Sequence, residues 1–120
     1  MDKVQALTAF WNSFNIPAYD VNSVPDDAQT PYLTFEVVTD SFDNEVAVTN
    51  SLWYKSTSWK DITQKADLIG ETIGRGGKLI SYDGGAIWIK RANPFSQRLS
   101  ENDTTKRIIL NFSLEYLSEN

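Results

Sequence analysis

The chain has 120 residues, a formal net charge of -5 at pH 7, and neither cysteine nor histidine. This length fits a single domain over residues 1–120, and the missing residue types exclude disulfides, thiolate nucleophiles and the commonest general base near neutral pH. The acidic balance disfavours nucleic-acid binding, and no stretch approaches the roughly 18 apolar residues of a membrane span, so we expect a protein made in the cytoplasm with no membrane partner.

The first predicted element is a short helix over Asp2–Phe14. Apolar residues recur there at spacings of three and four, at Val4, Leu7, Trp11 and Phe14. Pro17 follows and is expected to end the helix, with Asn15 as a residue suited to its C-terminus. A short edge strand is expected at Ala18–Tyr19, followed by turns.

Two strands are predicted next, over Tyr32–Thr39 and Glu45–Lys55, separated by the loop 40–44. Both show alternating apolar residues. In the second strand Val46, Val48, Leu52 and Tyr54 share one parity, with Asn50 between them, while Thr49 and Trp53 occupy the other. Large apolar groups on both faces indicate that one face meets a second subunit.

The stretch Ser58–Gly74 predicts the main helix, which we expect to lie across the sheet and close the core. Its apolar stripe comprises Trp59, Ile62, Ala66, Ile69 and Ile73. Ser58 is the expected N-cap, with Asp61 completing a capping box, and the glycines from Gly74 onward suit its end.

The last third predicts a hairpin and a long strand. Lys78–Tyr82 and Ala86–Arg91 flank the turn Asp83-Gly84-Gly85 and read as covered strands. Residues 92–103 read as irregular, and Lys106–Leu117 as the longest and most central strand. The fold class is therefore α+β, with an antiparallel or mixed sheet of four to five strands and two helices packed on one face.

The motifs that carry chemistry are missing. The run Gly74-Arg75-Gly76-Gly77-Lys78 is not a phosphate-binding loop, because it lacks the required earlier Gly and the Ser or Thr after Lys. Asp40, Asp43 and Glu45 do not match a calcium loop. Carboxylate pairs arise by chance among 16 acids, and no serine has a histidine partner. We therefore expect no enzyme activity, no cofactor and no metal.

Several segments together resemble a known protein family. They are FNIPAYDVNSVPDDAQTPYLTFEV, SLWYKSTSWKDITQKADLIGETIG and YDGGAIWIKRANPFSQRLSENDTTKRIILNFSLEYL. Within them the likeness is carried by Pro25 with Pro31-Tyr32, by the segment from Trp53-Tyr54 to Trp59, and by Pro94-Phe95 with the final long strand. The chain is similar over nearly its whole length to tail-completion, or tail-terminator, proteins of long-tailed bacteriophages and prophages of Gram-positive bacteria.

The resemblance implies a virion structural protein without cofactor or chemistry. Such proteins form a ring, usually a hexamer, that caps the tail tube and presents a surface to the head–tail connector. The expected partners are thus further copies of the chain, the tail-tube protein and the connector protein, with no sequence-specific nucleic acid. The expected location is the head-proximal end of the phage tail. A neighbouring role in head completion stays open.

Two regions are predicted to form the subunit or tail interface. One combines the loop residues Asp40, Phe42, Asp43 and Glu45 with Trp53, and the other comprises Pro94, Phe95 and Arg98. In a ring these unlike patches would meet head to tail. For Phe95 the alternative is that its side chain packs under its own loop, on its own subunit. For the whole chain the alternative is a small ligand- or glycan-binding α+β module that uses its aromatic residues.

Overall fold

The computed structural model describes residues 1–38 and 45–118, and shows an α+β fold with one six-stranded mixed sheet. The strand order is β1-β2-β3-β6-β5-β4, and only the β1–β2 pair is parallel. The sheet therefore has more strands than the four to five predicted. In the described part of the chain, no helix is long and apolar enough to cross a membrane.

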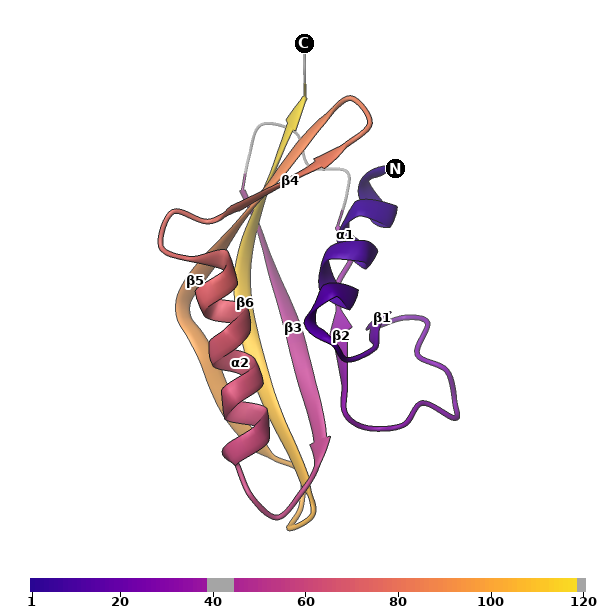
Figure 1. The fold of residues 1–120 in the computed structure, drawn as a ribbon, viewed down its shortest axis with the longest axis vertical. Coiled ribbons are helices and arrows are strands. Elements are labelled where there is room, and N and C mark those ends of the chain that lie inside the picture. The colour runs from indigo at the N-terminus through magenta and orange to yellow at the C-terminus, as the bar shows by residue number, and fades with distance from the viewer. Residues whose placement is uncertain (39–44, 119–120) are drawn as a thin grey trace.

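The two helices are α1 (Lys3–Trp11), which continues as the 3-10 turn η1 (Asn12–Phe14), and α2 (Lys60–Ile73). Both pack on the same face of the sheet (Figure 1). Trp11 from α1 lies 5.0 Å from Phe112 between ring centroids. The ammonium of Lys65 on α2 donates to the carbonyl of Phe14 at 2.7 Å, which ties the two helical segments together. The prediction of two helices on one face is confirmed.

The strands are β1 (Ala18–Asp20), β2 (Tyr32–Phe35), β3 (Glu45–Lys55), β4 (Lys78–Tyr82), β5 (Gly85–Ser100) and β6 (Thr105–Ser118). As predicted, β6 is central, lying between β3 and β5. It is not the longest strand, however, because β5 has 16 residues and β6 has 14. Its even-numbered side chains fill the core, namely Ile108, Leu110, Phe112, Leu114 and Tyr116. The odd-numbered ones point to the opposite face, which neither α1 nor α2 covers.

The predicted apolar stripes need one correction. In α2 the residues Ile62, Ala66, Ile69 and Ile73 are all buried, as expected. In α1, however, Val4 is 42% exposed and Ala6 is buried in its place beside Leu7 and Trp11. The helix is therefore rotated slightly from the predicted orientation, because Leu7 and Trp11 set the face that meets the sheet.

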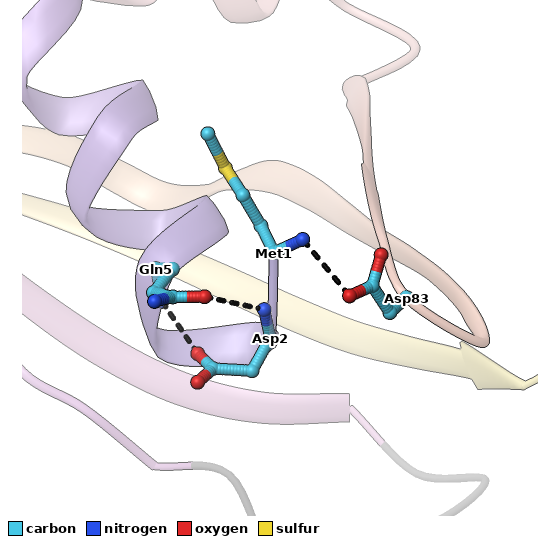
Figure 2. Close-up of polar contacts among 4 residues, drawn as sticks. All are labelled: Met1, Asp2, Gln5 and Asp83. Atoms are coloured by element: carbon cyan, nitrogen blue, oxygen red, sulfur yellow. Dashed lines mark hydrogen bonds and ion pairs between the residues drawn. The ribbon is translucent and has the colours of Figure 1, made fainter.

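The capping box predicted for α2 is found in α1 instead. α2 has Trp59 at its N-cap and no side-chain cap, although the hydroxyl of Ser58 accepts from the Lys60 amide at 3.1 Å. The capping box occurs in α1, where Asp2 accepts from the Gln5 amide and the Gln5 side chain accepts from the Asp2 amide (Figure 2). Asn15 has φ 65°, as suits its predicted place at the helix end.

The segment 92–103 was predicted to be irregular, but β5 continues to Ser100, and only residues 101–103 lie outside a strand. A register shift between Arg91 and Ser96 lets the strand pass Pro94, whose backbone has no N–H for the ladder. The side chain of Asn111 on β6 donates to the Pro94 carbonyl at 3.0 Å and so fastens the bulge. Sequence patterns do not reveal such a bulge because it interrupts the alternation.

Two further strand predictions differ from the structure. β2 ends at Phe35. The next residue, Glu36, accepts a hydrogen bond from the Thr49 amide at 2.5 Å with its side-chain carboxylate, so this amide does not pair with the backbone of β2. β4 is an edge strand rather than a covered one, and Leu79 is 58% exposed.

Candidate functional site

The most distinctive surface of the molecule is the sheet face opposite the helices, called here the open face. It carries the odd-numbered side chains of β3 and β6 with their neighbours on β2, β4 and β5. Antiparallel pairing places directly opposed residues on the same face. The register therefore defines rows of side chains that cross the sheet.

One row, called the tryptophan–arginine row, comprises Tyr32, Trp53, Arg107 and Leu99, which are directly opposed on four neighbouring strands. The Arg107 guanidinium lies 4.4 Å from the Trp53 ring centroid, within the range of a cation–π contact. The Trp53 indole N–H donates to the Thr34 hydroxyl at 3.1 Å. These contacts hold the row in one conformation.

Arg107 has further partners that fix its position. Its Nε donates to the Ser51 hydroxyl at 3.1 Å, and its Nη1 lies 3.4 Å from a carboxylate oxygen of Glu101. A cavity of about 460 Å³ opens beside this row, lined by Val21, Val24, Tyr32, Thr34, Glu36, Thr49, Ser51, Trp53 and Arg107. The cavity therefore combines aromatic walls, hydroxyl groups, one carboxylate and one guanidinium.

A second row, called the glutamate row, crosses the far end of the open face. It comprises Glu45, Glu115, Trp88 and Leu79, again directly opposed in register. Lys90 bonds Glu45, lies 3.7 Å from Glu115, and stands 4.4 Å from the Trp88 ring centroid. The hydrogen bond from Lys90 lowers the pKa of Glu45, and the same bond raises the pKa of Lys90.

The centre of the open face, between the two rows, is polar. Thr49 donates to the Asn111 side chain at 3.3 Å, and Asn111 donates to Gln97 at 3.2 Å. The open face is thus two aromatic and charged rows separated by an amide and hydroxyl network.

The predicted interface residues fall on opposite sides of the sheet. Glu45 and Trp53 lie on the open face at the two ends of β3. Asp40, Phe42 and Asp43 lie outside the described residues.

In the second predicted patch, Phe95 and Arg98 lie on the helix side of β5, whereas the Pro94 carbonyl accepts from Asn111 of the open face. Pro94 is exposed at the bulge, and Arg98 is exposed with its guanidinium 4.9 Å from the Trp59 ring centroid. Phe95 is half-buried and packs edge-to-face on Phe112 at 5.4 Å. This is the packing on its own subunit that was the alternative for Phe95.

Tyr32, Trp88, Lys90 and Arg107 were not among the predicted interface residues. For Arg107, the alternation of the last strand could have indicated a position on the open face, because Arg107 falls on the polar side of that strand. The register that brings it against Trp53 depends on the β3–β6 pairing, which the sequence does not specify. Among the described residues, no group of three or more potential metal-binding side chains of the His, Cys, Asp and Glu types occurs.

Comparisons of the chain with protein-family models, with curated proteins and with solved structures find no match.

Proposed function

We propose that this chain is a virion structural protein of a long-tailed phage, a tail terminator or tail-completion protein. In this proposal it forms a hexameric ring that caps the tail tube and joins it to the head–tail connector. The resemblance of the sequence segments supplies the functional class. The observation in the structure that supports it best is the open face.

The open face has the composition of a protein–protein contact surface. Aromatic residues and arginine are enriched at such surfaces, and here they are already held by contacts within the subunit. A preorganised surface loses less side-chain entropy on binding than a flexible one. Leu99, at the end of the tryptophan–arginine row, is 42% exposed and offers apolar area to a partner.

The positions of the two patches suit a ring. A cyclic ring requires two unlike patches on each subunit that meet head to tail. The open face and the exposed Arg98 side chain of β5 lie on opposite sides of the sheet. The net charge of -5 would also reduce adhesion of DNA passing through such a ring.

The test is a tail-tube polymerisation assay with the purified tube protein of the same phage. We expect the wild-type protein to cap tubes and shorten their length distribution. Leu99→Asp, which places a charge on the open face, should lose most of this effect. Leu68→Asp is the matched control, because Leu68 is 44% exposed on α2, away from the open face. Equal tube lengths with and without wild-type protein would contradict the proposal.

The cavity favours a second candidate function, a small ligand-binding module. Its walls include Tyr32 and Trp53, and its volume of about 460 Å³ is within the usual size range of ligand pockets. Sugar stacking on Trp53 is hindered because Arg107 already lies over one face of its ring. Saturable tryptophan quenching by a sugar or other small ligand, lost in Trp53→Phe, would favour this candidate over the ring.

A further inference from the structure

The two edges of the sheet differ in how their backbone groups are satisfied. At the β1 edge, the Asn12 side chain donates to the Ala18 carbonyl at 3.2 Å and accepts from the Ala18 amide at 3.0 Å. The Asp20 carbonyl accepts from the Ser23 amide at 2.8 Å. Three outward groups of this short strand, the amide and carbonyl of Ala18 and the carbonyl of Asp20, are thus bonded within the subunit, which protects the edge from pairing with another strand.

The β4 edge has no comparable cover. Asp83 and Gly84 form a two-residue turn, so Tyr82 and Gly85 are the hydrogen-bonded pair beside it. Along β4, every second residue from Tyr82 then forms backbone hydrogen bonds to β5. The amides and carbonyls of the residues between them, Leu79 and Ser81, point away from the sheet. The amide of Asp83, which has the same parity, bonds the Met1 carbonyl at 2.7 Å. Within residues 1–38 and 45–118, no backbone group bonds the outward groups of Leu79 or Ser81.

The side chains of β4 protect its edge only in part, because Lys78 at one end is the only charged residue of the strand. The strand has five residues without proline, and Leu79 is 58% exposed. Met1 bonds Asp83 at the end of the strand, next to the ion pair shown in Figure 2. This contact limits the free edge to the stretch around Ile80 and leaves that stretch open.

We propose that the free edge of β4 pairs antiparallel with the same edge of a second copy of the chain, about a two-fold axis at Ile80. Leu79 of each copy then lies opposite Ser81 of the other, and the outward amides and carbonyls of both residues form four hydrogen bonds. The two sheets become one continuous sheet across the contact.

The charges at the two ends of the free edge favour a second copy of the chain as the partner, and they favour antiparallel pairing. Lys78 stands at one end of the free edge, and the Asp83 carboxylate, with its side chain 86% exposed, stands at the other. Antiparallel pairing brings Lys78 of one copy beside Tyr82 and Asp83 of the other. Parallel pairing would instead place Lys78 beside Lys78, which costs free energy. The edge is therefore complementary to itself.

This contact goes beyond the proposed ring. A two-fold contact uses one patch on both subunits and closes at two, so it cannot by itself form a hexameric ring. It would pair free subunits, or join two rings. Because it uses few hydrogen bonds and little area, we expect a dissociation constant on the order of 100 μM.

The test uses a substitution at an outward-facing amide. Ser81→Pro removes one donor from the free edge, and a proline is tolerated where the N–H of an edge strand faces solvent. Ser81→Ala is the control that keeps the amide. We expect analytical ultracentrifugation up to about 1 mM to show a two-copy association step for the wild type and Ser81→Ala. Ser81→Pro should weaken this step at least about tenfold.

A second variant covers the case that Ser81→Pro does not fold. Leu79→Lys changes an exposed side chain and adds two positive charges across the contact, so it should also abolish the two-copy step. In hydrogen exchange, the Leu79 and Ser81 amides of the wild type should become protected as concentration rises. A wild type without a two-copy step, concentration-independent exchange at these amides, or Leu79→Lys associating like the wild type would overturn the proposal. Because Ser81 belongs to neither row of the open face, capping of tail tubes by Ser81→Pro tests the ring separately.

Discussion

Asn50 lies on the core side of β3, between Val48 and Leu52, and its side chain is 1% exposed. Neither its amide nitrogen nor its amide oxygen has a hydrogen-bond partner among the described residues. An amide buried in this way loses its bonds to water without replacement. Asn50 is therefore a weak point of the core.

Replacing this amide with an apolar group should stabilise the fold. We expect Asn50→Leu to raise the free energy of unfolding by about 1–2 kcal/mol, because the desolvation cost disappears while the branched shape of the side chain is kept. Urea unfolding monitored by tryptophan fluorescence measures the change. Asn111→Leu is the control: that amide bonds Pro94 and Gln97, so its loss should lower stability. A loss of stability in Asn50→Leu would contradict this prediction.

At the scale of elements, the contact between α2 and β5 depends on one glycine. A Cβ added at Gly70 would lie 2.9 Å from Cε2 of Phe95, closer than side chains normally approach. Gly70 thus lets the Phe95 ring lie against the helix while it packs on Phe112. This explains a glycine in the middle of a helix, where it otherwise costs about 1 kcal/mol.

A double-mutant cycle tests this contact. Phe95→Ala should lower the free energy of unfolding by about 2–4 kcal/mol, since it removes a half-buried ring from the core. Gly70→Ala should then add about 1 kcal/mol in the Phe95→Ala background, because the helix gains propensity without a clash. In the wild-type background the same change should gain less or destabilise. If Gly70→Ala has equal effects in both backgrounds, the two residues are not coupled.

The elements that the sequence predicted well are those with an uninterrupted period. The stripe of α2 and the alternation of β6 persist over several repeats, so the buried faces of both were predicted correctly. Short or interrupted elements were not. The bulge at Pro94 interrupts the alternation of β5, so the second half of this strand was not predicted. β2 ends early because the Glu36 carboxylate bonds the Thr49 amide on the next strand.

At the scale of the whole molecule, the open face was only partly predictable. Parity alone placed Trp53 on the side away from the core and led to the hypothesis of a second contact surface. The rows themselves depend on register, which sets Arg107 opposite Trp53 and Glu115 opposite Glu45. Register follows from the packing of the whole sheet and cannot be predicted from the sequence of one strand alone. The position of Phe95 against Gly70 depends likewise on how α2 lies across β5.

The central claim is that copies of this chain assemble into a ring through the open face. Native mass by light scattering, over a concentration series and with tail-tube protein added, tests it most directly. We expect a discrete hexameric species, alone or on the tube, for the wild type and Leu68→Asp, and its loss in Leu99→Asp. A wild-type protein that stays smaller than a ring at every concentration, and that also fails to assemble on the tube, would contradict the account.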